Sequence, residues 1–295
     1  MFKTFEMELA GRPLIIETGK MAKQANGAVL VRYGDTSVLV ATTASKEPRE
    51  GTDCYPLTVD YEEKLYAVGK MPGGFLRREG RPGNSAILCA RLIDRPIRPL
   101  FDKRCRNDIH VVATVLSVDY DNAPELCGMI GASASIGISD IPWDGPIAGV
   151  RVGRVDGKYV INPTQEEMAA STMNVTVAGS EEAIMMVEGG AQEAPEEEVL
   201  DPMMFGHATL KEICRFQKKI IEEVGKEKRV LTFPEVPAEI EKDVEAFATE
   251  SLKKAIFDAD KLRRDGNIAA AKTAAMSHFA EFYPEDLSDV VDALD

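Results

Sequence analysis

Residues 28–40 read AVLVRYGDTSVLV and give the clearest structural signal at the start of the chain. Two apolar runs rich in β-branched residues flank the segment Tyr33-Gly34-Asp35-Thr36, whose Gly-Asp pair accepts the positive φ of a tight hairpin turn. The pattern therefore predicts two antiparallel strands joined by this turn. Shorter strand patterns occur at residues 14–16 and 57–61. We expect antiparallel β structure over the first 65 residues or so.

A helix is predicted after this β region. Apolar residues recur at helical spacing from residue 87 to residue 93, and either Asn84 or Ser85 would be a good N-cap. Pro96 should end this helix near Asp94, because the residue before a proline avoids the helical conformation.

The middle of the chain mixes strand and helix patterns. A buried strand is expected from 109 to 118, and the small apolar residues 129–138 predict a tightly packed core helix. Thr164 with Glu167 is a capping-box pattern and should begin a short helix. Further strands are expected at 147–155, 158–161, 174–178 and 183–187.

The last third of the chain is predicted to be helical. Apolar residues recur every three to four positions over 195–224, and the C-terminal helix of the first domain is expected from about residue 203. Residues 230–237 contain two prolines and predict a linker. Residues 238–295 show helical periodicity without a strand pattern, and they end in mid-pattern, as a truncated domain would. The expected fold is therefore α+β over 1–230, followed by a small all-α domain.

Composition narrows the function. The 295 residues carry a formal net charge of −14, which argues against a nucleic-acid partner, and no run approaches the ~18 apolar residues of a membrane span. The start does not resemble a signal peptide, so no membrane partner is expected. Only three histidines occur, and neither a Walker loop nor a nucleophile elbow is present. The five cysteines are odd in number and lack the spacing of a zinc site, which favours reduced thiols in the cytoplasm. They are Cys54, Cys89, Cys105, Cys127 and Cys214.

One window opposes the overall acidity. The thirty residues 77–106 contain nine basic and three acidic residues, so this window carries +6 while the rest of the chain carries −20. Eight of the nine basic residues are arginines, whose planar guanidinium groups bind phosphates in a bidentate manner. An arginine-rich subunit contact is the alternative interpretation.

The start of this window combines an aromatic residue with paired arginines. Residues 74–82 read GFLRREGRP. An exposed ring can stack on a base while guanidinium groups hold phosphates, which is how single-stranded RNA is bound without sequence preference. Pro96 and Pro99 should hold the neighbouring Arg95 and Arg98 on extended backbone. The candidate RNA-binding residues are Phe75, Arg77, Arg78, Arg81, Arg91, Arg95 and Arg98.

The stretch from Gly73 to Phe101, together with 33–36 and 129–134, resembles the first core domain of the bacterial polynucleotide phosphorylase family over the whole chain. The resemblance implies an RNase PH-like α+β core followed by part of a helical linker domain. It also implies a homotrimeric ring in which inorganic phosphate, with Mg²⁺ or Mn²⁺, cleaves mRNA from its 3′ end to nucleoside diphosphates. The arginine segment matches the family's channel constriction. Single-stranded RNA is the implied partner, and no DNA partner is expected.

Several positions depart from the family pattern. Leu76 replaces the second of two aromatic residues, which halves the stacking capacity. Where the catalytic second core has an acid and a lysine, this chain has Asn174 and Thr176, and the position of the phosphate loop reads as the acidic segment 121–125. Acidic groups there would repel phosphate. We therefore expect a non-catalytic first core, with no catalytic residue, metal ligand or bound cofactor in this chain.

Two alternatives remain open at this point. The chain could be a complete small RNase PH-type phosphorylase, which the missing acid and lysine disfavour. It could also be a non-catalytic scaffold whose arginines make subunit contacts. Release of nucleoside diphosphates would favour the first alternative, and failure to crosslink to an RNA 3′ end would favour the second.

Overall fold

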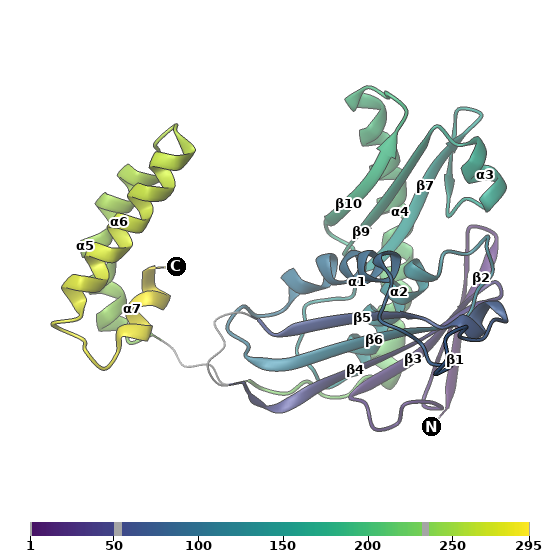
Figure 1. Cartoon of the computed structure of the whole chain (residues 1–295), viewed down its shortest axis with the longest axis horizontal. Coiled ribbons are helices and arrows are strands. Elements are labelled where there is room, and N and C mark those ends of the chain that lie inside the picture. Colours follow the sequence, from purple (N-terminus) through teal and green to yellow (C-terminus); the bar gives the residue numbers. More distant parts are fainter. Residues whose placement is uncertain (1, 50–54, 232–235, 295) are drawn as a thin grey trace. The chain divides into compact units, whose positions relative to one another are not determined.

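The computed structural model describes residues 2–49, 55–231 and 236–294. The chain divides into two compact units, residues 1–231 and 232–295, and Figure 1 shows the elements of each. Cys54 and the middle of the predicted linker lie outside the described residues.

The larger unit begins with a six-stranded sheet whose strands lie in the order β1-β2-β3-β4-β6-β5. The bounds are Lys3–Leu9 for β1, Arg12–Thr18 for β2, Gly27–Tyr33 for β3, Thr36–Pro48 for β4, Leu57–Glu63 for β5 and Asn107–Ser117 for β6. The predicted hairpin is confirmed, because Tyr33 pairs with Thr36 and Gly34 has a φ of +58°. The expectation of wholly antiparallel pairing is wrong, since β5 runs parallel to β6. A helix connects these two strands, as parallel neighbours require.

That connecting helix, α1 (Asn84–Ile97), is longer than predicted and is followed by the short 3₁₀ helix η2 (Arg98–Leu100). Pro96 lies in its last turn rather than beyond its end. The Arg98 N–H still donates to the Asp94 carbonyl, and Ile93, Pro96 and Ile97 are buried. Burial of this apolar face outweighs the local preference of the residues around a proline. The predicted Asn84 or Ser85 cap is also wrong, because the N-cap is Gly83.

A second, four-stranded sheet has the order β10-β9-β7-β8. Its strands are β7 (Ala148–Val155), β8 (Lys158–Ile161), β9 (Met173–Gly179) and β10 (Ile184–Ala191). Asp156 and Gly157 both have positive φ, as the tight turn between β7 and β8 requires. The predicted capping box is confirmed at helix α3 (Gln165–Ala170), where Thr164 and Glu167 bond each other's backbone N–H.

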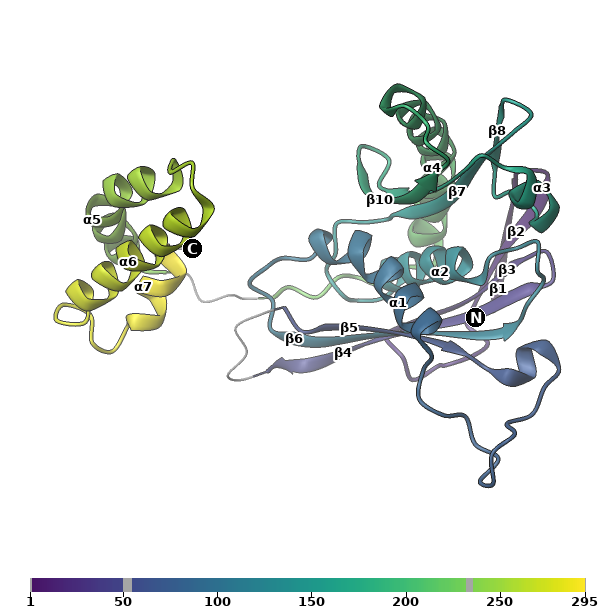
Figure 2. The same ribbon diagram turned by 45° about the horizontal axis from the view of Figure 1, so that its top comes forward.

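Helix α2 (Pro124–Ile138) packs against strands of both sheets, and Figure 2 shows it above the first sheet. Thirteen of its residues are buried, which explains the lack of a polar face in its sequence. The predicted core helix at 129–138 is confirmed, although it begins at Pro124. Glycine allows the close approach to the sheet, because a Cβ at Gly131 would lie 2.5 Å from Val40 Cγ2.

Two further helical parts complete the chain. Helix α4 (Glu196–Val224) packs on β7 and β9 and begins seven residues before the expected residue 203, with Pro202 inside it. The smaller unit contains α5 (Ala238–Ile256), α6 (Lys261–Phe279) and α7 (Leu287–Leu294). These helices have their own apolar core, formed by Ile240, Val244, Ala275, Phe279 and Val290.

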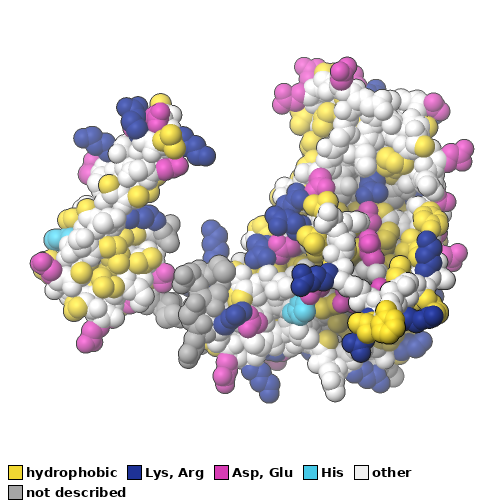
Figure 3. Space-filling model, viewed as in Figure 1, with side chains coloured by type: hydrophobic (Ala, Val, Ile, Leu, Met, Phe, Trp, Pro, Cys, Tyr) yellow, Lys and Arg dark blue, Asp and Glu magenta, His cyan; other side chains and the backbone are white. Residues whose placement is uncertain are grey.

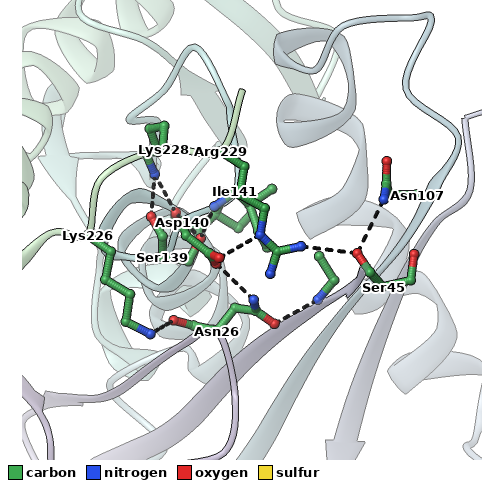
Figure 4. A network of polar contacts seen from close by, with 11 residues as sticks. Asn26, Ser45, Asn107, Ser139, Asp140, Ile141, Lys226, Lys228 and Arg229 are labelled. Carbon is green, nitrogen blue, oxygen red and sulfur yellow. Dashed lines mark hydrogen bonds and ion pairs between the residues drawn. The ribbon is translucent and has the colours of Figure 1, made fainter. Parts of the chain in front are cut away.

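The segment after α4 is fixed by a polar network (Figure 4). The Lys228 ammonium donates to the carbonyls of Ile136, Gly137 and Ser139 at 2.8 to 3.1 Å, and so satisfies the C-terminal end of α2. The Arg229 guanidinium pairs with Asp140 at 2.5 Å. The chain is therefore held to the first unit up to residue 229.

Replacing Lys228 by methionine should lower the free energy of unfolding by about 1–2 kcal/mol, because three helix-end carbonyls lose a charged donor while the apolar stem is kept. Chemical denaturation of the full chain measures this effect. Lys219→Met is the matched control, since Lys219 is an exposed lysine of α4 with no hydrogen bond or ion pair to any described residue. An equal loss in both variants would contradict the capping role.

Candidate nucleic-acid interface

The candidate interface is built on the segment between β5 and α1, which extends away from the sheet in Figure 2. The 3₁₀ helix η1 (Leu65–Val68) begins this segment, and we call residues 71–82 the arginine loop. The Glu79 carboxylate accepts a hydrogen bond of 2.9 Å from the Leu65 N–H at the start of η1. This bond joins the two arms of the segment at its base.

The tip of the arginine loop presents its apolar side chains to solvent. Phe75 is 101% exposed and Leu76 is 72% exposed, and Figure 3 shows hydrophobic side chains projecting beside basic ones on this face. A turn bond of 3.0 Å from the Arg77 N–H to the Gly74 carbonyl shapes the tip, and Arg77 has a φ of +47°. Two adjacent apolar side chains this exposed, next to basic ones, make the tip a candidate interaction surface.

Four of the predicted arginines keep their guanidinium groups available. The side chains of Arg77, Arg78, Arg81 and Arg91 make no hydrogen bond or ion pair with any residue that the structure describes. Arg91 lies on α1 and lines a hollow of about 290 Å³ together with Pro82, at the end of the arginine loop. The hollow therefore connects the loop to α1.

The other two predicted arginines are engaged. Arg95 pairs with Glu188 of β10 at 2.9 Å, and Arg98 forms a two-bond pair with Asp94. Arg98 also donates to the carbonyl of Leu57 at 3.0 Å. The expectation of extended backbone is wrong here, because Arg95 is within α1 and Arg98 has helical dihedral angles. Arg95 thus links α1 to β10, and Arg98 links the end of α1 to β5.

The acidic segment 121–125 is held by partners from distant parts of the chain. Glu125 pairs with Arg151 of β7 at 2.7 Å, and the Asp121 carboxylate accepts the Gln165 N–H. Next to this segment, hydrogen bonds from the Asp121 N–H and the Asn122 amide lower the pKa of Asp119 despite some burial.

Thr176 lies directly opposite Arg151 on the neighbouring strand and is 5% exposed, whereas Asn174 on the same strand is exposed. The structure therefore brings Glu125, Arg151 and Thr176 together, but as an internal ion pair beside a hydroxyl. Asn174 and Thr176 supply no carboxylate to the described site.

Three thiols among the described residues are poor nucleophiles. Burial raises the pKa of the Cys89, Cys127 and Cys214 thiols to about 12, which suppresses the nucleophilic thiolate. No group of three or more His, Cys, Asp or Glu residues in the described parts is placed to hold a metal ion. None of the described helices is both long and apolar enough to cross a membrane.

Glu79 is the interface residue that the sequence did not indicate. In the sequence, Glu79 only lowers the net charge of the basic window. In the structure, its carboxylate joins the two arms of the segment at the base of the loop. The sequence signal for this role is the position of Glu79 between Arg78 and Arg81, and that position does not predict a specific bond. Its partner lies fourteen residues earlier, at a separation that no helical or strand pattern predicts.

Comparisons with known proteins agree with this fold. A model of the 3′ exoribonuclease family, domain 1, matches residues 10–142, and domain 2 of the same family matches 145–209. Relatives named polyribonucleotide nucleotidyltransferase from Heliobacterium modesticaldum and Syntrophomonas wolfei are each 54% identical over 293 residues, 99% of this chain. The chain spans only 41% and 42% of their lengths. A crystal structure of rice (Oryza sativa) Rrp46 matches 75% of this chain and 94% of its own with a TM-score of 0.56 and 15% identity, a likeness of fold.

Proposed function

The chain belongs to the 3′ exoribonuclease family, and from this premise we propose that it is the RNA-binding first core of a phosphate-dependent 3′–5′ exoribonuclease. The curated relatives are named polyribonucleotide nucleotidyltransferase. The observation that carries the proposal is the arginine loop, where a fully exposed Phe75 stands beside guanidinium groups without internal partners. That combination suits a flexible, negatively charged strand with unpaired bases.

Each part of the loop has a distinct task in this proposal. Phe75 stacks on a base, with Leu76 as a second apolar surface, and Arg77, Arg78 and Arg81 bind successive phosphates. Arg91 continues the path onto α1 through the hollow beside Pro82. Arg95 and Arg98 extend the path only by binding a phosphate and their present carboxylate partner at the same time, because each is already paired with a carboxylate.

The whole protein is proposed to degrade mRNA to nucleoside diphosphates in the cytoplasm as a homotrimer, using inorganic phosphate and Mg²⁺ or Mn²⁺. The described residues at the matching positions do not fit this metal chemistry. Glu125 is committed to Arg151, and the neighbouring strand offers the amide Asn174 and the hydroxyl Thr176 instead of carboxylates. We therefore derive no catalytic step in this chain and assign phosphorolysis to the part of the relatives that the chain does not match.

The RNA-binding proposal predicts a salt-dependent affinity for single-stranded RNA. Four unpaired arginines displace about four counterions, so the logarithm of the association constant should fall with a slope of about −3 against the logarithm of salt concentration. Raising the salt from 50 to 200 mM should then weaken binding roughly fiftyfold. Fluorescence anisotropy with a labelled oligoribonucleotide measures the slope, and a flat salt response would contradict phosphate binding.

Two further measurements separate the alternatives. A small complete phosphorylase would release nucleoside diphosphates from RNA when phosphate is added to the purified chain, and we expect none from this chain. A scaffold whose arginines contact only other subunits would give no photocrosslink between the arginine loop and an RNA 3′ end. A crosslink at Phe75 without phosphorolysis is the outcome that the proposal expects.

A further inference from the structure

A second basic site lies in the larger unit, among residues other than those of the arginine loop. A cavity of about 800 Å³ opens between the segment 18–28 and the last turn of α4. Its volume is in the range of small-molecule sites. We call this cavity the lysine pocket, and its charged and aromatic lining residues are Phe2, Lys3, Lys20, Lys23, Glu223 and Lys226.

The lining has four ammonium groups and one carboxylate, in a chain whose net charge is −14. Lys20 and Lys23 make no hydrogen bond or ion pair with any described residue. Lys3 is held by Glu223 at 2.7 Å, and Lys226 donates to the Asn26 carbonyl at 2.5 Å. Two of the four charges are therefore available, and a third is restrained only by an exposed ion pair, which contributes little to stability.

An aromatic ring lies at the same pocket. Phe2 is 49% exposed, and the Lys20 ammonium lies 5.7 Å from the centre of its ring. The ring and the ammonium group together provide two features that nucleotide binding needs, an apolar surface for the base and a positive charge for the phosphate.

The frame of the pocket is held by the polar network of Figure 4. Asn26 donates to Asp140 and accepts from the Ala44 N–H, so the lining segment is tied to β4 and to the segment that follows α2. Lys226, which follows α4, donates to the Asn26 carbonyl and so holds the same lining segment from the α4 side. A fixed frame reduces the entropy that a ligand must overcome on binding.

We propose that the lysine pocket binds a free nucleotide that carries at least two phosphates, such as a nucleoside diphosphate. Lys20 and Lys23 bind the phosphates, Lys3 joins them when it leaves Glu223, and Phe2 contacts the base. A free nucleotide fits better than an RNA strand, because only two of the lining ammonium groups are without a hydrogen-bond or ion-pair partner among the described residues and both line one hollow of about 800 Å³. RNA shares the phosphate chemistry and is the alternative occupant that the experiment distinguishes.

The test is calorimetric titration of the full chain with ADP, with AMP and inorganic phosphate as comparison ligands. Lys20→Gln with Lys23→Gln should weaken ADP binding at least tenfold, whereas Glu223→Gln should strengthen it severalfold by releasing Lys3. The matched control is Lys158→Gln with Lys219→Gln, which removes two exposed lysines outside the pocket and should leave ADP binding unchanged. Circular dichroism of each variant checks that the fold is intact.

Opposite shifts in the lysine and glutamate variants support the pocket, because general damage to the fold would weaken both. Absence of ADP binding at millimolar concentration would overturn the proposal, as would equal effects of the pocket and control variants. If the pocket variant weakened binding of a 5′-hydroxyl oligoribonucleotide and left ADP unaffected, the occupant would be RNA and the nucleotide assignment would be wrong. Loss of ADP binding only in Arg77→Ala with Arg78→Ala would place the ligand on the arginine loop instead.

Discussion

RNA affinity should fall roughly 30-fold to 150-fold when Arg77 and Arg78 are both replaced by alanine. Each guanidinium that binds a phosphate is expected to contribute about 1–1.5 kcal/mol at an exposed site, and 1.4 kcal/mol corresponds to a tenfold change. Neither side chain makes a hydrogen bond or ion pair with a described residue, so their removal should leave the free energy of unfolding nearly unchanged. The effect should therefore appear in binding alone.

The salt slope gives a second readout of the same variant. Removing two phosphate contacts should make the slope shallower by about 1.4, because each contact with a single strand contributes about 0.7. Lys158→Ala with Lys219→Ala is the charge-matched control, since both lysines are exposed and lie outside the basic window. If the control lowered affinity and slope as much as the arginine variant, the general charge of the chain would govern binding, and the loop would have no special role.

Replacing Gly27 by alanine should have the largest effect on stability, a loss of about 3 kcal/mol or more. A Cβ at this position would lie 1.9 Å from the backbone oxygen of Ser135 in α2 and 3.1 Å from the Cβ of Ser139. A backbone atom inside a buried helix cannot yield as a flexible side chain can, so the helix and β3 must separate. Such a loss is a large part of the 5–15 kcal/mol that stabilises a typical domain.

Gly190→Ala is the matched control for this prediction. Gly190 also lies in a strand, but its added Cβ would meet no atom within 4 Å and its φ is not positive. Urea denaturation should give Gly190→Ala a free energy of unfolding within about 0.5 kcal/mol of that of the parent chain. A Gly27→Ala value equally close to the parent would show that α2 does not pack on β3 as described.

Local signals predicted the elements whose causes are local. The Gly34 turn and the Thr164 capping box each depend on residues within four positions, and both form as expected. Helix α1 passed its predicted end because tertiary burial of Ile93 and Ile97 opposes the local effect of Pro96. The parallel pairing of β5 with β6 depends on a crossover of more than forty residues, which no strand pattern within β5 can report.

The candidate interface shows the same division. The basic window and the neighbouring ring of Phe75 are properties of composition, so the sequence identified them directly. Which arginines are available depends on partners far along the chain. Arg95 is engaged by Glu188, ninety-three residues away, while Arg91 on the same helix has no such partner among the described residues. The difference in pairing between Arg95 and Arg91 can therefore be seen only in the folded arrangement of α1 beside β10.

The position of helix α2 has a consequence for how the larger unit unfolds. The helix lies within the segment matched by domain 1 of the family, yet it packs on β7 and α4 beyond the boundary with domain 2. Separating the two segments would expose an apolar helix surface that has no polar face to turn toward water. The boundary between the two family models is therefore not a boundary between two parts that unfold independently. Both segments should lose their structure in one cooperative step, with the amide protons of α2 among the last to exchange with solvent.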